Sequence, residues 1–278
     1  MNSRTVSAVS YTLIWRSWHC PGIMNTIRPE ARVFMNRLLL LGNSKNQKEP
    51  YLGHAESEIT RLLGNKRANV LFIPYAQVLP SFDLFAATAR EGFQRMGYDL
   101  ASIHMSDDPH EAIREAEAIV IGGGNTFHLL HKLEERNLLT PIRDSVEAGT
   151  PFIGWSAGAN VACPSIKTTN DMPIVEPMSL NALGLVPFQI NPHYVDCSDD
   201  PTVETREERL NEFTEVNPDI YVVALREGSF LRVDEISIEL FGALGARIFK
   251  KGKSPQDYRA GEAFDFLLPA HAAILSVT

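Results

Sequence analysis

From Arg37 onward, short apolar runs alternate with segments whose apolar residues recur every three or four positions. Continuous apolar runs of this length are typical of strands buried on both faces, and the periodic segments are typical of helices that bury one stripe. The alternation indicates a three-layer α/β sandwich, with a mainly parallel sheet between two layers of helices. Strands are predicted at 38–44, 69–76, 98–104, 118–125 and 151–156, and helices at 54–64, 81–96, 109–117, 126–136 and 141–148.

The pattern loosens after Cys163, where a Thr/Asn/Pro-rich passage begins. An apolar run spans 185–194, and three apolar residues share one face of a helix predicted at 205–216. Because no repeat or low-complexity linker divides the chain, residues 35–278 are predicted to form a single α/β domain. Short strands of more antiparallel character are predicted at 220–225, 230–234, 236–241 and 246–249.

The first 34 residues differ in composition from the rest. Four arginines are set against one acid, Glu30, among several serines and threonines. This bias resembles an organelle presequence, although the apolar core of a secretory signal is missing. A translation start at Met35 would explain the segment equally well. We predict that residues 1–34 are a poorly ordered extension outside the fold.

Charge and composition exclude several classes of protein. The formal net charge is −8 and no dense block of lysine and arginine occurs, so no nucleic-acid or membrane surface is expected. No apolar run approaches the roughly 20 residues of a membrane-spanning helix. The three cysteines lie far apart and suggest neither a disulfide framework nor a zinc site, and Cys163 is predicted to be a buried small hydrophobe. We expect a cytoplasmic protein whose partners are small molecules or peptides.

The stretch Gly154-Trp155-Ser156-Ala157-Gly158 satisfies the G-x-S-x-G pattern, in which a serine hydroxyl is exposed on a tight turn between a strand and a helix. The context fits, because an apolar strand precedes the serine and a short helical segment follows it. Ser156 is therefore a candidate nucleophile, with the backbone N–H of Ala157 facing the developing oxyanion. The alternative is an ordinary strand-to-helix corner built from small residues.

A serine needs a base to act as a nucleophile at neutral pH. Among eight histidines, His193 stands out because it lies at the predicted carboxyl end of a strand, the edge where parallel α/β sheets gather their sites. Its alternative is a structural role beside Tyr194. Two acids could orient the imidazole: Asp171 in the loop between the serine and the histidine, and Glu227 after the strand at 220–225.

A second glycine cluster, Gly-Gly-Gly-Asn at 122–125, also ends a strand and precedes a helix. It does not match the dinucleotide fingerprint, since position 127 is phenylalanine, and no lysine follows as in a P-loop. It is interpreted as a second oxyanion loop, with the N–H of Gly124 beside that of Ala157. A glycine-rich turn needed only for its backbone geometry is the alternative.

Taken in order along the chain, these segments resemble peptidase E, a family of serine peptidases that remove an N-terminal aspartate from short peptides. The likeness runs from about Met35 to about Lys251. It is carried by LLLLGNS, VLFIPYA, IVIGGGNTFHLL, FIGWSAGANVACPSIKTTNDMPIV, LVPFQINPHY, ETREERL and REGS.

The resemblance implies a fold like that of class I glutamine amidotransferases, with Ser156 on a strained elbow and His193 as its base. The acid is then Asp171 or Glu227, and Asp171 is favoured because Arg226 replaces the proline of the family's P-E-G segment. The family's substrate-binding arginine falls on Arg206, whose guanidinium can grip an aspartate carboxylate through two hydrogen bonds. Without the resemblance, Arg206 would be read as an exposed helical arginine.

The resemblance therefore implies a cytoplasmic aspartyl dipeptidase, monomeric or homodimeric, that needs no metal or organic cofactor. Three other functions stay open. A cyanophycinase-like enzyme would cleave β-aspartyl bonds instead. An α/β-hydrolase esterase shares the G-x-S-x-G pattern, although only a short segment separates Ser156 from His193. A non-catalytic scaffold would leave the clustering of these residues at strand ends unexplained.

Overall fold

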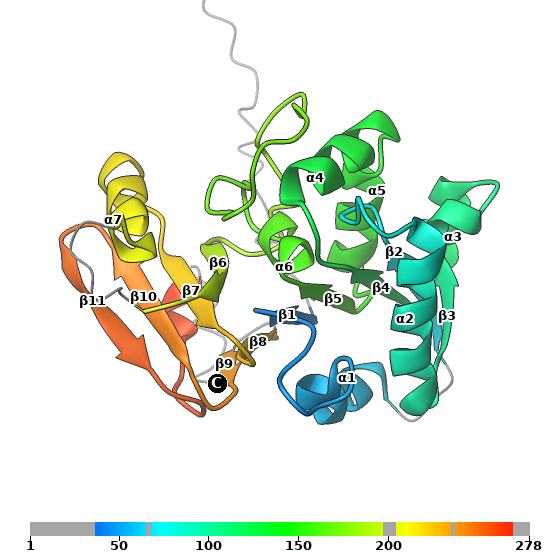
Figure 1. Cartoon of the computed structure of the whole chain (residues 1–278), viewed down its shortest axis with the longest axis horizontal. Helices are drawn as coiled ribbons and strands as arrows, with labels where there is room; N and C mark the ends of the chain where they lie inside the picture. The colour runs from blue at the N-terminus through cyan, green and yellow to red at the C-terminus, as the bar shows by residue number, and fades with distance from the viewer. Residues whose placement is uncertain (1–36, 65–67, 197–203, 235–236, 269–278) are drawn as a thin grey trace, which may run out of the picture. The chain divides into compact units, whose positions relative to one another are not determined.

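The computed structural model describes residues 37–64, 68–196, 204–234 and 237–268, all of which fall within one compact unit. The predicted extension at 1–34 lies outside the described residues. Two sheets organise the described chain (Figure 1).

The larger sheet has seven strands. Five neighbouring strands pair in parallel, and two further strands are added at one edge through antiparallel pairings. Every residue of β1 (Leu38–Leu41), β4 (Ala118–Ile121) and β5 (Phe152–Trp155) is buried, as their continuous apolar runs predict. The strand order is β3 (Asp99–Ser102), β2 (Asn69–Ile73), β4 (Ala118–Ile121), β5 (Phe152–Trp155), β1 (Leu38–Leu41), β8 (Phe230–Val233) and β9 (Ile238–Phe241).

Helices cover both faces of this sheet, so the prediction of a three-layer α/β sandwich is confirmed (Figure 1). Alternate leucines of β1 enter two different cores, because successive strand side chains point to opposite faces. One core is closed by α1 (Glu56–Leu63) and α2 (Phe82–Arg95). The other is closed by α3 (Pro109–Glu115), α4 (Thr126–Glu135), α5 (Leu139–Glu147) and α6 (Ala157–Val161). Short 3-10 turns lie at Gly53–Ala55, Ile103–Met105 and Asp265–Leu267.

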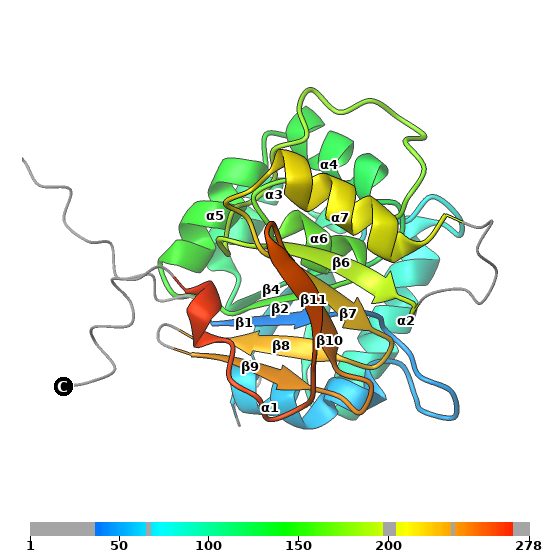
Figure 2. The ribbon, with the colours of Figure 1, turned by 90° about the vertical axis from the view of Figure 1, so that its left-hand side faces the viewer.

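The second sheet has four strands and faces the viewer in Figure 2. β6 and β7 are parallel, and the other pairs are antiparallel. α7 (Arg206–Val216) packs on this sheet through Leu210, which shares a small core with Phe249. The strand order is β11 (Lys253–Tyr258), β10 (Ala246–Lys250), β7 (Val222–Arg226) and β6 (Gln189–Tyr194).

One strand was not predicted. β11 has the sequence Lys-Ser-Pro-Gln-Asp-Tyr, and none of its residues is fully buried. It lies at the edge of its sheet, where a proline and polar side chains are tolerated. Its position depends on pairing with β10, which hydrophobic periodicity does not report.

Within the described residues, no helix has the length and apolar character needed to cross a membrane.

Candidate active site

Ser156 lies at the elbow between β5 and α6, as the sequence predicts. Its φ of 53° and ψ of −113° are unusual for a residue other than glycine and cost about 1–3 kcal/mol. The turn is held by close backbone packing, since a Cβ added to Gly154 would lie 2.4 Å from the Gly158 carbonyl oxygen. The Ser156 N–H donates to the Leu41 carbonyl at 2.9 Å, and its own carbonyl accepts from Asn160 at 2.9 Å. These contacts fix the hydroxyl at the carboxyl edge of the large sheet.

His193 reaches Ser156 from the second sheet. Its Nε2 lies 2.7 Å from the Ser156 Oγ, so a neutral imidazole can accept the hydroxyl proton there. The pairing of β6 with β7 is irregular between Asn191 and Tyr194, and His193 itself has a φ of 54°. Such irregularities redirect a side chain out of the ordinary strand alternation. The structure therefore brings together the serine and the histidine selected from the sequence.

Glu227 completes a hydrogen-bonded chain of three residues. Its Oε1 lies 2.6 Å from the His193 Nδ1. Glu227 follows β7 directly, and the parallel pairing of β7 with β6 brings the two strand ends together. The side chains of His193 and Glu227 are 40% and 47% exposed, so water screens their attraction. The contact fixes the orientation of the imidazole.

Asp171, the acid favoured from the sequence, has a different set of partners. Its Oδ2 accepts from the Thr126 N–H at 2.7 Å, from the Thr126 hydroxyl at 2.6 Å and from the Thr169 hydroxyl at 3.0 Å. Thr126 is the first residue of α4, where free N–H groups and the helix dipole favour a carboxylate. Of the two candidate acids, the structure places Glu227 against His193 and uses Asp171 to fix a loop on α4.

Asn43 supports the Glu227 segment and was not selected from the sequence. It is buried at the end of β1, and its Oδ1 accepts from the Gly228 N–H at 2.8 Å. Its Nδ2 donates to the Lys45 carbonyl at 2.9 Å and to the Asn46 Oδ1 at 3.0 Å. The only sequence signal was its place in Gly-Asn-Ser at the carboxyl end of a predicted strand.

The two predicted oxyanion donors lie on different elements, Ala157 in α6 and Gly124 in the glycine loop between β4 and α4. Ala157 is the first residue of α6, a position whose N–H has no acceptor within the helix. Gly124 is exposed and has a φ of 138°. Its neighbour Gly123, which was not singled out, packs directly against Ser156, since a Cβ there would lie 3.0 Å from the Ser156 Cβ. Three consecutive glycines were the available signal.

Arg206 begins α7, behind a capping box formed by Thr205 and Glu208. Among the described residues, its buried Nη1 has no hydrogen-bond partner. Burial lowers the pKa of the guanidinium, and the negative charge of Glu227 opposes that shift. A buried N–H group without an acceptor is costly, and an anionic ligand would supply the missing acceptor. Arg206 therefore offers a buried donor that a carboxylate could satisfy.

A cavity of about 450 Å³ lies beside Glu227, between the loop after β1 and the loop before β10. Glu227 and Gly228 form one wall, and the other lining residues are Lys45, Asn46, Gln47, Ala243 and Leu244. Within the described part of the chain, no group of three or more His, Cys, Asp or Glu side chains is arranged to hold a metal ion.

Cys163 is fully buried, as predicted. Its Sγ accepts from the Ile190 N–H at 3.2 Å, and burial raises the pKa of the thiol. A thiol that stays protonated is a poor nucleophile, which leaves Ser156 as the nucleophile candidate at this edge.

The sequence matches the model of peptidase family S51 over residues 38–241. The chain belongs to peptidase family S51. A Peptidase E from Nostoc sp. is 51% identical over 233 residues, which cover 84% of this chain and 96% of the relative. A Peptidase E from Shewanella amazonensis is 46% identical, with 84% and 99% covered. The resemblance drawn from the sequence is thereby confirmed.

The fold of this S51 chain is also found in a solved structure. A peptidase from an acI-B1 Actinobacterium superposes with a TM-score of 0.62 at 19% identity, covering 83% of this chain and 96% of the other. At this identity the likeness concerns the fold alone. The S51 match includes Ser156, His193, Arg206 and Glu227, and it ends before β10 and β11.

Proposed function

We propose that this chain is a serine dipeptidase that hydrolyses short peptides with an N-terminal aspartate through an acyl-enzyme on Ser156. The observation that carries the proposal is the chain of hydrogen bonds from Ser156 Oγ through His193 to Glu227, with separations of 2.7 and 2.6 Å. Membership of peptidase family S51 and the Peptidase E relatives support the peptide substrate.

In the proposed first step, the Ser156 Oγ attacks the carbonyl carbon of the Asp–X bond while His193 Nε2 takes its proton. Glu227 keeps the imidazole in the tautomer with a proton on Nδ1 and stabilises the imidazolium that forms. His193 then gives the proton to the leaving amine as the C–N bond breaks, and the aspartyl group remains as an ester on Ser156. His193 then takes a proton from a water molecule, whose oxygen attacks the ester carbonyl carbon. The bond to Ser156 breaks, aspartate leaves, and His193 returns the proton to the Ser156 Oγ.

The negative charge that develops on the carbonyl oxygen needs donors that are already in place. We assign this role to the N–H of Ala157 and to the N–H of Gly124, with Gly123 allowing the glycine loop to lie against Ser156. Removing one such donor from a serine peptidase lowers kcat by about 100- to 1,000-fold. The positive φ of Ser156 is typical of the strained backbone found at catalytic sites.

Arg206 is assigned to the aspartate side chain of the substrate. Its unpaired buried Nη1 supplies the reason for preferring an acid over a neutral residue at this position. An arginine with no bound carboxylate leaves its donors unsatisfied, so asparagine in place of aspartate loses charge-assisted hydrogen bonds of about 1.5–3 kcal/mol.

The test is a panel of dipeptides incubated with the wild-type protein and with Ser156→Ala. Asp-Leu should be hydrolysed, Asn-Leu and Glu-Leu should be much poorer substrates, and Ser156→Ala should lose the activity. Hydrolysis of a β-aspartyl dipeptide in preference to Asp-Leu would replace the proposal with a β-aspartyl peptidase. Cleavage of p-nitrophenyl acetate without any dipeptide would indicate an esterase.

A further inference from the structure

Two arginines of the second sheet join three carboxylates into one chain of ion pairs, here called the Arg226–Arg247 network. Arg226 binds both carboxylate oxygens of Asp196, at 3.0 Å from Nε and 2.6 Å from Nη2. The same Nη2 donates to the Asp257 Oδ1 at 2.6 Å. Arg247 binds Asp257 through Nε and Nη2, at 3.0 and 2.6 Å, and its Nη1 donates to the Glu207 Oε2 at 2.6 Å.

The ends of this network adjoin the candidate active site. Arg226 immediately precedes Glu227, and Asp196 lies three residues after His193, just beyond the end of the neighbouring strand β6. The Arg226 guanidinium also lies over the ring of Tyr194, 5.7 Å from its centroid. The Arg226–Asp196 ion pair therefore joins the segment that follows His193 to the segment that precedes Glu227.

The other end reaches the substrate arginine. Glu207 directly follows Arg206 in the first turn of α7, and its carboxylate is held by Arg247. The Tyr194 hydroxyl lies 3.5 Å from the same Glu207 oxygen, which brings the residue next to His193 within reach of this end as well. A shift of Glu207 would move the helix start that carries the Arg206 side chain.

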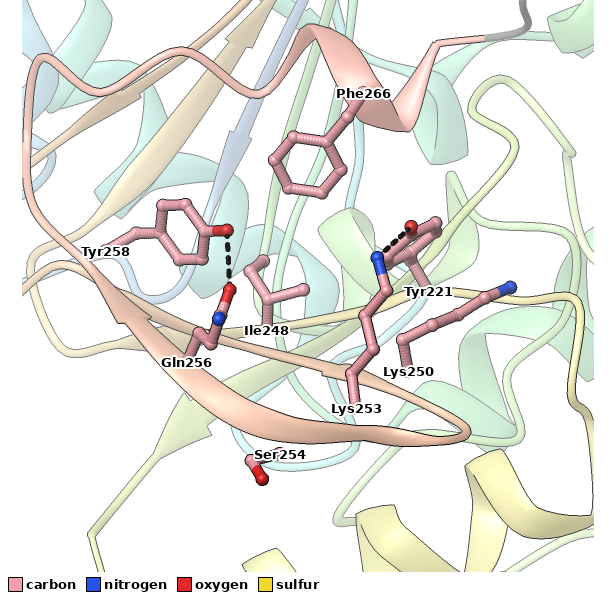
Figure 3. A pocket seen from close by; sticks show the side chains of 8 residues that line it. All are labelled: Tyr221, Ile248, Lys250, Lys253, Ser254, Gln256, Tyr258 and Phe266. Atoms are coloured by element: carbon pink, nitrogen blue, oxygen red, sulfur yellow. Dashed lines mark hydrogen bonds between the residues drawn. The ribbon is translucent and has the colours of Figure 1, made fainter.

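Asp257 of β11 links the two arginines. Figure 3 shows Gln256 and Tyr258 of this strand pointing into a pocket of about 250 Å³ on one face of the sheet. Successive strand side chains point to opposite faces, so Asp257 points to the other face, where its register partner Arg247 also lies. β11, which the sequence pattern did not predict, thus supplies the carboxylate that joins the two arginines.

The two arginines of the network are largely buried, whereas its carboxylates are partly exposed. The side chains of Arg226 and Arg247 are only 12% and 21% exposed, and a guanidinium so withdrawn from water needs paired carboxylates. The two guanidinium groups in turn lower the pKa of Asp257 to about 2, so the network stays charged at neutral pH. Bidentate contacts add a defined geometry that a single point charge lacks.

We propose that Arg226 and Arg247 are positioning residues. Linked through Asp257, they hold the His193–Glu227 pair and Arg206 at fixed positions relative to each other. This inference rests on the proposed function for the roles of those groups. Because the two arginines act on different ends, their loss has different kinetic effects. Loss of Arg226 affects the chemical step, and loss of Arg247 affects the binding of the aspartate side chain.

The experiment compares Arg226→Gln, Arg247→Gln and the control Glu111→Gln, which removes an exposed ion pair with Arg114 on α3. It measures kcat and KM for Asp-Leu and the rate at which a fluorophosphonate labels Ser156. Arg226→Gln should lower kcat and the labelling rate about 10-fold with little change in KM. Arg247→Gln should raise KM about 10-fold and leave the labelling rate within about twofold of wild type.

Equal kinetic constants for both variants and the control, in folded protein, would overturn the proposal, as would a loss of thermal stability alone. If Arg226→Gln does not fold, Asp257→Asn replaces it, because Asp257 is half exposed, and it should show both effects in weaker form. If the wild-type protein is labelled at Ser156 but does not cleave Asp-Leu, the substrate assignment fails and the labelling rates alone decide the role of Arg226.

Discussion

The Glu227 Oε1 lies 2.6 Å from the His193 Nδ1, on the side of the imidazole opposite Ser156. The two residues are 34 positions apart in the chain and meet because β6 and β7 run side by side in the same direction. Each is held by its own support: an irregular strand end redirects His193, and buried Asn43 binds the backbone just after Glu227.

Replacing Glu227 by glutamine should lower kcat for Asp-Leu at least about 100-fold, because an amide can present an N–H to Nδ1 and favour the wrong imidazole tautomer. Asp171→Asn is the matched comparison, since it makes the same change in the other candidate acid. It should keep kcat within a few-fold and lower the free energy of unfolding by about 1–3 kcal/mol, through weaker hydrogen bonds to Thr126. Steady-state kinetics and urea titration of both variants provide the check, and the reverse ranking would restore Asp171 as the acid.

Replacing Arg206 by glutamine should raise KM for Asp-Leu about 10- to 100-fold, because a bidentate, charge-assisted contact with the substrate is lost. Arg209→Gln is the control, since Arg209 lies on the same helix, is exposed and pairs with Glu204. The informative measurement is the ratio of kcat/KM for Asp-Leu to that for Asn-Leu. An unchanged ratio in Arg206→Gln would show that another group reads the aspartate side chain.

Adding a methyl group at Gly123 should displace Ser156 directly. The new Cβ would lie 3.0 Å from both the Ser156 Cβ and the Trp155 Cδ1, which is closer than ordinary packing allows. Gly123→Ala should therefore reduce kcat about 10- to 100-fold, since a displacement of the hydroxyl or of the oxyanion donors is amplified in the chemical step. Kinetics and the thermal midpoint are measured together, and full activity in this variant would argue against a packed elbow.

The low pKa of Asp257 predicts a pH dependence of stability. Its folded pKa of about 2 lies below the unfolded value of roughly 3.9, so between these values the unfolded chain binds more protons. The stabilisation is present above this window and is lost as the pH falls through it. Urea unfolding between pH 2 and 5 should show that the free energy of unfolding falls less with decreasing pH in Asp257→Asn than in wild type.

Salt offers a control for this pH effect, because the Asp257 side chain is half exposed and its ion pairs are partly screened. The difference between wild type and Asp257→Asn should shrink in 1 M NaCl. Parallel stability curves at low salt would contradict a role for this carboxylate in acid stability.

The large sheet could be predicted from the sequence because its strands are buried on both faces. Leu38 to Leu41 and Ala118 to Ile121 are continuous apolar runs, and the helices between them keep a clear period. Ser156 could be predicted as well, since the glycines on either side of it are required by an elbow in which two backbone segments nearly touch. Local sequence alone determines these features.

The choice between Asp171 and Glu227 could not be made in the same way. Both are loop acids near a predicted strand end, and only the parallel pairing of β6 with β7 decides which one reaches His193. β11 was missed for a related reason. It is held by Asp257 ion pairs and by an edge pairing with β10, and neither leaves an apolar pattern in the sequence.

The central claim is that Ser156 is a nucleophile activated by His193, and active-site labelling tests it most directly. The wild-type protein and His193→Gln are incubated with a fluorophosphonate, and the modified residue is located by mass spectrometry while Asp-Leu hydrolysis is followed. We predict one modification, on Ser156, that grows in step with the loss of hydrolysis and is at least about 100-fold slower in His193→Gln. Labelling at another residue, or full labelling of Ser156 with hydrolysis intact, would contradict the account.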